Sequence, residues 1–254
     1  MTITFNDGEA YEDFMGKWSR LAGEKFLAWL GAPPGMRWVD VGCGNGAFTE
    51  LIVERCAPSR VEGIDPSEEQ VAYARKRVGE GRAHFRTGDS MALPYADAGF
   101  DIAAMGLVIF FMPDPQKGVA EMARVTRAGG TVASYAWDIL GGGFPANDVL
   151  AEMQAMGLTP PYPPSVAAAG IDASREIWRK AGLREIETTQ ITVERTFRDA
   201  EDYWATCRKG PGTGGRLKAL PDGEREELKK RVSTRLPGSP VTIRARANAI
   251  RGIK

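Results

Sequence analysis

A glycine-rich loop between a short apolar segment and a helix constrains the fold of this chain more than any other feature. The loop occupies residues 42–46 (GCGNG), directly after the apolar segment 38–41 (WVDV). Residues 48–56 follow it with the pattern of a helix. Glycines at such a turn let the backbone approach a ligand closely, and the helix start offers unpaired N–H groups. The loop predicts an α/β fold with a ligand site here, against the alternative of a turn that binds nothing.

Strand and helix patterns alternate beyond the loop. Ser67 suits the cap of a helix that runs to about residue 78, with Gln70 at the third position after the cap. The alternation is typical of a parallel sheet with helices on both faces. The expected strands are residues 38–41, 60–64, 83–87, 101–105 and 131–137, and the expected helices are residues 9–30, 48–56, 67–78 and 116–126, with a turn at 129–130.

The pattern changes after residue 138. β-branched residues over 186–196 and apolar–polar alternation over 241–249 predict two strands whose hairpin would close the sheet edge. Glycines at 141–143 and prolines at 160–164 mark flexible stretches, the second of them either a substrate loop or a linker. Further helices are expected at 146–156, 175–181 and 222–235, and insertions over one end of the sheet at 139–170 and 197–240.

Charge and composition restrict the class of partner. The chain has 33 Lys and Arg against 33 Asp and Glu, which gives no general attraction to nucleic acid or to an anionic membrane. The longest apolar run, residues 102–112, is too short to span a bilayer. One histidine, His84, and three cysteines without a CxxC pair do not make a usual zinc site. Because the N-terminus lacks a signal-peptide pattern, we expect reduced cysteines, a cytoplasmic protein, no metal and no membrane span.

Two kinds of nucleotide cofactor use a glycine loop of this type. A dinucleotide places its pyrophosphate at the helix start and requires G-x-G-x-x-G/A, which Gly42, Gly44 and Ala47 fit loosely. S-adenosylmethionine has no phosphate and presents a cationic amino group instead. Asp40 suits that amino group and would repel a pyrophosphate, and Gly46 completes the pattern D-x-G-x-G-x-G. The acid therefore favours S-adenosylmethionine over NAD.

Five segments, in order, resemble the motifs of one enzyme family. They are residues 39–49 (VDVGCGNGAFT), 61–74 (VEGIDPSEEQVAYA), 88–101 (GDSMALPYADAGFD), 107–115 and 127–134 (RAGGTVAS). On these residues the chain is similar to the class I S-adenosylmethionine-dependent methyltransferases, in particular the ubiquinone/menaquinone-biosynthesis (methyltransferase type 11) group. The resemblance covers about residues 37–137. It implies a Rossmann-like, seven-stranded, mostly parallel α/β sheet with helices on both faces and an antiparallel last strand.

The same resemblance divides one methyltransferase domain, residues 1–254, into three parts. An N-terminal helical lid (1–35) precedes a cofactor-binding core (36–138), and inserted cap segments with the closing strands (139–254) lie on the substrate side. Tyr11, Phe14, Met15 and Trp18 share one face of the first helix. They either form a lid that excludes water from the cofactor or pack the helix onto the domain.

The resemblance also assigns roles to the acids at strand ends. Asp65 would accept hydrogen bonds from both ribose hydroxyls, the alternative being an acid that flanks the next helix. Asp89 would take the adenine amino group, the alternative being a plain Gly-Asp turn. The expected cofactor residues are Tyr11, Trp18, Asp40, Gly42, Cys43, Gly44, Gly46, Asp65, Pro66, Gln70, Asp89, Ser90, Met91, Met105 and Gly106.

Methyl transfer from a sulfonium is an in-line displacement, in which alignment supplies much of the rate. Many relatives carry a His-His pair after the fourth strand, where this chain has Phe110 and Phe111. We expect these two, with Trp137, to line an apolar substrate pocket, the alternative being core packing. Tyr135 and Asp138 are candidates for a general base.

The sequence thus predicts methyl transfer from S-adenosylmethionine to a small molecule with an oxygen, carbon or nitrogen nucleophile, leaving S-adenosylhomocysteine. Two alternatives stay open. An NAD-type oxidoreductase would leave Asp40 and the Gly88–Asp89 segment without a role. A non-catalytic S-adenosylmethionine-binding regulatory protein is compatible with Phe110 and Phe111 where many relatives have histidines.

Overall fold

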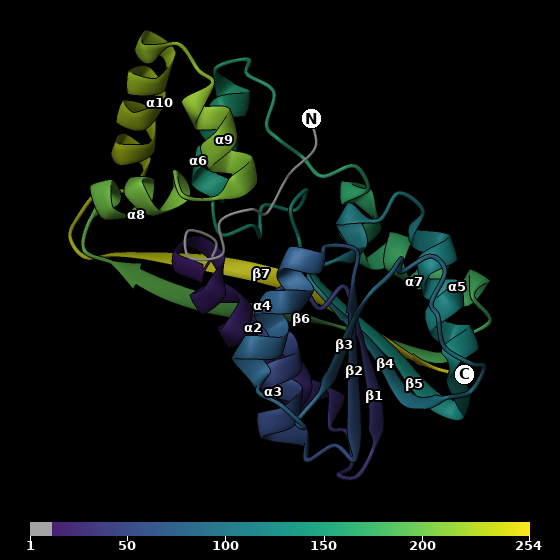
Figure 1. The fold of residues 1–254 in the computed structure, drawn as a ribbon. Helices are drawn as coiled ribbons and strands as arrows, with labels where there is room; N and C mark the ends of the chain where they lie inside the picture. The colour runs from purple at the N-terminus through teal and green to yellow at the C-terminus, as the bar shows by residue number, and fades with distance from the viewer. Residues whose placement is uncertain (1–11) are drawn as a thin grey trace.

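A seven-stranded sheet forms the centre of the molecule, in the order β3-β2-β1-β4-β5-β7-β6 (Figure 1). The computed structural model describes residues 12–254, so Tyr11 lies outside the described residues. The first five strands run parallel and β7 is antiparallel between β5 and β6, which confirms the predicted topology. The strands are β1 (Arg37–Val41), β2 (Arg60–Asp65), β3 (His84–Thr87), β4 (Phe100–Gly106), β5 (Thr126–Trp137), β6 (Arg184–Phe197) and β7 (Val241–Ile253).

Helices cover both faces of the sheet, with α2, α3 and α4 on one face and α5 and α7 on the other (Figure 1). A separate group of helices, α6, α8, α9 and α10, gathers at one end of the long β6–β7 hairpin. The helices are α2 (Lys17–Leu30), α3 (Ala47–Cys56), α4 (Glu68–Val78), α5 (Pro115–Val125), α6 (Asn147–Ala155), α7 (Ile171–Lys180), α8 (Ala200–Cys207), α9 (Pro211–Lys218) and α10 (Asp222–Arg235), with short turns η1 (Glu12–Gly16), η2 (Ile109–Phe111) and η3 (Val166–Ala169).

The glycine loop and the start of α4 fold as their sequences require. Gly46 has φ +79°, and a Cβ there would lie 2.9 Å from the Cβ of Ala74 on α4. A Cβ on Gly42 would lie 2.6 Å from the side chain of Val108. The hydroxyl of Ser67 accepts a hydrogen bond from the backbone N–H of Gln70 at 3.3 Å, as the capping pattern predicts. Glycine is therefore needed both for the turn and for the close approach of two neighbouring segments.

Packing attaches the first helices firmly to the sheet. On α2, the ring of Phe26 lies 4.7 Å from that of Tyr135 on β5 and 5.8 Å from that of Phe48 on α3. Trp18 is 1% exposed, and its ring lies 6.4 Å from that of Phe197. The apolar face predicted for residues 9–30 is thus core for the described part of the segment.

Three details differ from the prediction. The expected turn at 129–130 lies inside β5, which starts at Thr126 and has a register shift opposite the start of β4. Pairing with the neighbouring strands overrides the local turn preference of two glycines. Helices α8 and α9 lie in the expected insertion 197–240, where no helix was placed before residue 222. Helix α9 contains glycine at 212, 214 and 215, a poor helix composition that tertiary packing overrides.

The structure shows the state of the three cysteines and the character of the described helices. All three cysteines, Cys43, Cys56 and Cys207, are buried free thiols. No helix within residues 12–254 combines the length and apolar character needed to cross a membrane.

Candidate active site

Three acids from successive strands meet at the carboxyl edge of the sheet. Asp40 is the fourth residue of β1, Asp65 ends β2, and Asp89 follows β3. The strand order β3-β2-β1 makes these ends neighbours, and the register pairs Val41 with Ile64 and Asp65 with Thr87. The structure therefore brings together the acids that the sequence singled out.

Asp40 is a buried carboxyl group with one unsatisfied oxygen. The residue is 1% exposed, and its Oδ2 accepts a hydrogen bond from the hydroxyl of Thr49 at 2.6 Å. Its Oδ1 is buried without a hydrogen-bond partner. Burial, opposed by the Thr49 bond and reinforced by the charge of Asp65, raises the pKa of Asp40 to about 7. A cation beside Oδ1 would satisfy the group and favour its ionised form.

Asp65 ties the glycine loop to the end of β2. Its Oδ2 accepts the backbone N–H of Gly44 at 2.9 Å, and its Oδ1 accepts that of Ser67 at 2.9 Å. Burial raises the pKa of Asp65 against these two hydrogen bonds. Each carboxylate oxygen keeps a second lone pair for another donor. Asp65 thus flanks the next helix, which was one of the two predicted roles. Its remaining lone pairs leave it able to accept hydrogen bonds from the hydroxyls of a ligand.

The loop presents backbone rather than side chains. The N–H groups of Gly42 and Cys43 both donate to the carbonyl of Ile64, at 2.8 and 3.0 Å. The side chain of Cys43 is buried in a small cluster with Val71 and Phe85. The buried thiol of Cys43 therefore belongs to the packing of the loop, and a cofactor role for the residue stays a prediction.

Asp89 lies at an exposed turn. Its Oδ1 accepts the N–H of Met91 at 2.8 Å, and its carbonyl accepts that of Ala92 at 3.1 Å. This is the turn geometry that its short acidic side chain favours. Ser90 and Met91 are half-buried beside it. The adenine role stays a prediction.

The β2–α4 turn carries two more of the expected cofactor residues. Pro66 is exposed and Gln70 is half-buried. Both lie on the same sheet edge as Asp65, and their roles stay predictions.

The end of β4 combines a buried side chain with a strained backbone turn, and the cofactor role of Met105 and Gly106 stays a prediction. Met105 is fully buried, so its side chain belongs to the core. Leu107, just after Gly106, has φ +62°, and its N–H donates to the carbonyl of Tyr135 at 2.8 Å. A non-glycine residue in the left-handed region stores strain that is concentrated at functional sites.

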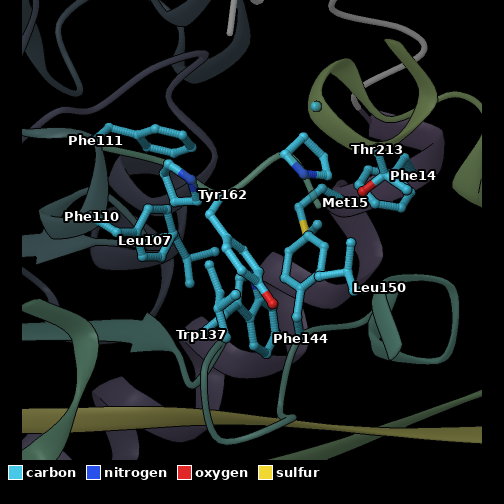
Figure 2. Close-up of a pocket in the computed structure, with 14 residues that line it drawn as sticks. Phe14, Met15, Leu107, Phe110, Phe111, Trp137, Phe144, Leu150, Tyr162 and Thr213 are labelled. Atoms are coloured by element: carbon cyan, nitrogen blue, oxygen red, sulfur yellow. The ribbon is translucent and has the colours of Figure 1, made fainter. Parts of the chain in front are cut away.

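An apolar cavity, partly open to solvent, begins at this point (Figure 2). Leu107 and Phe110 lie on one side of it, and Phe14, Met15 and Thr213 on the other. Phe110 and Phe111 pack edge to face with centroids 4.7 Å apart. The lining residues are Phe14, Met15, Leu107, Phe110, Phe111, Trp137, Ile139, Phe144, Leu150, Pro161, Tyr162, Pro163, Gly212 and Thr213.

The cavity contains several predicted positions and some that sequence reasoning missed. Phe110, Phe111 and Trp137 line it where a substrate pocket was expected, although Phe110 and Trp137 are also buried core residues. Phe144, Leu150 and Thr213 were missed, because they come from inserted segments without a motif. The aromatic residue directly after the glycine run 141–143 was the one available signal.

One short segment joins the glycine loop to the cavity. The side chain of Val108 fills the space above Gly42, while its neighbours Leu107 and Phe110 line the cavity. A ligand that follows the loop toward β4 therefore reaches the cavity wall.

Neither candidate base lines the cavity. The ring of Tyr135 packs against Phe48, and its hydroxyl lies 3.0 Å from the position a Cβ on Gly106 would take. The carboxylate of Asp138 accepts from Arg246 Nη2 at 2.6 Å and from Nε at 3.0 Å. A catalytic role for either residue stays a prediction.

The N-terminal segment contributes to the cavity through residues 14 and 15. Phe14 and Met15 lie on its wall, whereas Trp18 packs into the core. Phe14 and Met15 thus combine core packing with a place in the cavity wall, and the lid role of this segment stays a prediction.

Comparison with known proteins identifies the family. Residues 39–134, which contain the glycine loop, match the model of a family described as "Methyltransferase domain". O-methyltransferase rstn1 of Aspergillus nomiae is 30% identical over 166 residues, covering 64% of this chain and 70% of that protein. Demethylmenaquinone methyltransferase of Desulfitobacterium hafniense is 35% identical over 116 residues, covering 44% of this chain and 46% of that protein.

A solved structure shares the fold across nearly the whole chain. It is phosphoethanolamine N-methyltransferase 2 of Haemonchus contortus with S-adenosylhomocysteine, with TM-score 0.61 and 19% identity, covering 96% of this chain and 56% of that one. The chain spans a little under half the length of the first curated relatives it matches. From its ordered motifs, sheet topology and relatives, the chain belongs to the class I S-adenosylmethionine-dependent methyltransferase family.

Proposed function

We propose that the chain transfers a methyl group from S-adenosylmethionine to a small-molecule acceptor. The observation that carries the proposal is the buried Asp40, whose Oδ1 has no hydrogen-bond partner beside the glycine loop. A buried carboxyl group without a partner is costly, and a cationic amino group would relieve that cost. This fits S-adenosylmethionine and opposes the pyrophosphate of a dinucleotide.

In this proposal, each residue at the sheet edge binds a different part of S-adenosylmethionine. Asp40 receives the amino group, and Asp65 uses its remaining lone pairs for the ribose hydroxyls. Asp89 takes the adenine amino group, and the backbone carbonyls of Met105 and Gly106 hold the methionine portion. The bound molecule supplies a methyl group on a sulfonium, which is a good leaving group.

The two parts of the chain have separate tasks in this proposal. Residues 36–138 bind S-adenosylmethionine, while residues 139–254 supply most of the acceptor side through α6, α9 and the loop before η3. Phe110, Phe111 and Trp137 hold the acceptor and exclude water. Aligning the acceptor with the methyl group is the main catalytic contribution.

Calorimetry and a transfer assay test the proposal. We expect S-adenosylmethionine and S-adenosylhomocysteine to bind and NAD not to bind. We also expect radiolabelled methyl transfer to at least one member of a metabolite library. Binding of NAD in place of S-adenosylhomocysteine would contradict the cofactor, and cofactor binding without any transfer would favour a regulatory protein.

A further inference from the structure

The cavity beside β4 is lined almost entirely by apolar side chains. Six of its fourteen lining residues are aromatic and none of the fourteen carries a charge. The rings come from η1, from the segment after β4, from the end of β5 and the loop that follows it, and from the loop before η3, so they surround the space (Figure 2). Such a lining binds flat rings through shape and dispersion.

This lining disfavours a charged acceptor. A carboxylate inside the cavity would lose its water without gaining a cation from any described lining residue, which is costly. A permanently cationic acceptor would meet the aromatic faces favourably but would be repelled by the sulfonium. The acceptor is therefore uncharged apart from the atom that reacts.

The polar side-chain groups of the described lining are two neutral hydroxyls and the indole N–H of Trp137, which is buried without a hydrogen-bond partner. The hydroxyl of Tyr162 accepts a hydrogen bond from Gln154 Nε2 at 2.8 Å and keeps its own proton to donate. Thr213 adds a second hydroxyl on the opposite wall (Figure 2). Neutral hydroxyls orient a polar acceptor atom, and they are poor proton acceptors.

The acid that stands in the sequence between the lining residues Trp137 and Ile139 is already paired with other groups. Asp138 holds Arg246 through two hydrogen bonds, and its Oδ1 accepts the N–H of Gly141 at 3.2 Å. The lining described by the structure thus contains no aspartate, glutamate or histidine to remove a proton. The acceptor has to lose its proton by its own acidity.

From these observations we infer that the acceptor is a flat aromatic molecule, uncharged outside its reacting group, whose own ring hydroxyl ionises to give the nucleophile. This inference rests on the proposed methyl transfer. The hydroxyl gives its proton to water, and the resulting oxygen anion forms the bond to the methyl carbon. The electron pair of the carbon–sulfur bond passes to sulfur, leaving neutral S-adenosylhomocysteine. In apolar surroundings the attraction between this anion and the sulfonium is strong.

A series of ring-substituted naphthols of graded acidity tests the inference on the unmodified protein. We expect kcat/KM to rise with pH at a midpoint that follows the pKa of each naphthol, around 10 for an unsubstituted phenol-type hydroxyl. The Asp138→Asn variant should keep these midpoints even where its rates fall. A midpoint that is the same for every naphthol would show a protein base and overturn the inference.

Paired acceptors test charge selection. A naphthol with a carboxylate at the far ring edge should have a kcat/KM about 100-fold below that of its methyl ester, because the carboxylate has no cationic partner in the cavity. Leu150→Lys, checked for unchanged thermal unfolding, should narrow this gap. Preference for the carboxylate, or for amines of the same shape, would overturn the inference.

Calorimetry with S-adenosylhomocysteine distinguishes failure of this inference from failure of the proposed function. If the chain binds S-adenosylhomocysteine but methylates only carboxylates or amines, the proposed function stands and this inference is wrong. If the chain binds neither S-adenosylmethionine nor S-adenosylhomocysteine, both the proposed function and this inference are wrong. If S-adenosylhomocysteine binds and no naphthol is methylated, failure of naphthols to quench tryptophan fluorescence in that complex would also overturn the inference.

Discussion

In the proposed binding mode, a cationic ligand gives Asp40 Oδ1 the partner that this buried oxygen lacks in the described structure. Its pKa is about 7 in the ligand-free chain, chiefly from burial, against an ordinary value of 3.8. The folded protein therefore binds a proton that the unfolded chain releases between these two values. By linkage, the contribution of Asp40 to stability falls as pH rises from about 4 to about 7 and is level above that.

The same linkage predicts a pH dependence for ligand binding. The ammonium of S-adenosylhomocysteine should displace the proton of Asp40, so affinity should increase as pH rises toward 7 and then level off. Calorimetry in two buffers of different ionisation enthalpy measures the proton released. Asp40→Asn should abolish both the release and the pH slope. An affinity that does not change with pH in the wild-type chain would contradict the pairing.

Asp65 should contribute to affinity through hydroxyl contacts. We expect Asp65→Ala to weaken S-adenosylhomocysteine binding by ~1–3 kcal/mol, the cost of leaving hydrogen-bonding groups unpaired. Asp65→Asn, which retains one acceptor oxygen for the loop, should lose part of that amount. Glu69→Ala, an exposed acid on the next helix, is the matched control. Unchanged affinity in Asp65→Ala, measured by calorimetry, would remove the residue from the site.

Residue positions at the sheet edge were predictable because they follow from local sequence. Gly42, Gly46 and the acids stand at the ends of apolar strands, and parallel strands end at the same edge. The partners of these residues were not predictable. The hydroxyl of Thr49 on α3 donates a hydrogen bond to Asp40 on β1. Arg246 donates to Asp138, although the two residues lie 108 positions apart in the sequence. Such contacts depend on packing rather than on spacing.

At the scale of elements, the loop after β5 positions part of the cavity wall. Arg246 on β7 binds Asp138 and also donates to the carbonyl of Gly141 at 2.8 Å. A Cβ on Gly143 would lie 2.5 Å from the carbonyl oxygen of Arg246, so the loop needs glycine there. The loop connects Ile139 to Phe144, and both line the cavity.

Substitutions in this ion pair distinguish a positioning role from a general base. If Asp138 positions the loop, Asp138→Asn and Arg246→Met should both raise KM for the acceptor several-fold and leave S-adenosylhomocysteine affinity unchanged. The lost charge-assisted bonds contribute about 1.5–3 kcal/mol to the loop. A loss in kcat of about 10²–10⁴ in Asp138→Asn alone would instead identify a general base. Steady-state kinetics on both variants decides between the roles.

The elements that were predicted share strong local signals, and those that were missed lack them. Ser67 marked the start of α4, and alternation revealed β7. By contrast, α9 has three glycines in eight residues, so nothing in its composition predicts a helix. Its Thr213 nevertheless lies in the cavity wall, so the shape of the cavity depends in part on a segment with a weak sequence pattern.

At the scale of the whole molecule, one sheet edge carries both candidate ligand sites. The acids occupy the ends of β1, β2 and β3, while the cavity begins at the ends of β4 and β5. Residues 107–111 belong to both halves, because Val108 packs above the glycine loop and Leu107 lines the cavity. The cofactor half was predictable from motifs, whereas the acceptor half required the folded arrangement of η1, α6 and α9.

A crystal structure of the chain with S-adenosylhomocysteine would test the proposed binding mode most directly. The predicted complex has the ligand amino group at Asp40, the ribose at Asp65 and the sulfur facing the cavity beside Leu107. Binding should leave the cavity open to an acceptor. A ligand seated elsewhere, or with its sulfur turned away from the cavity, would contradict the central claim.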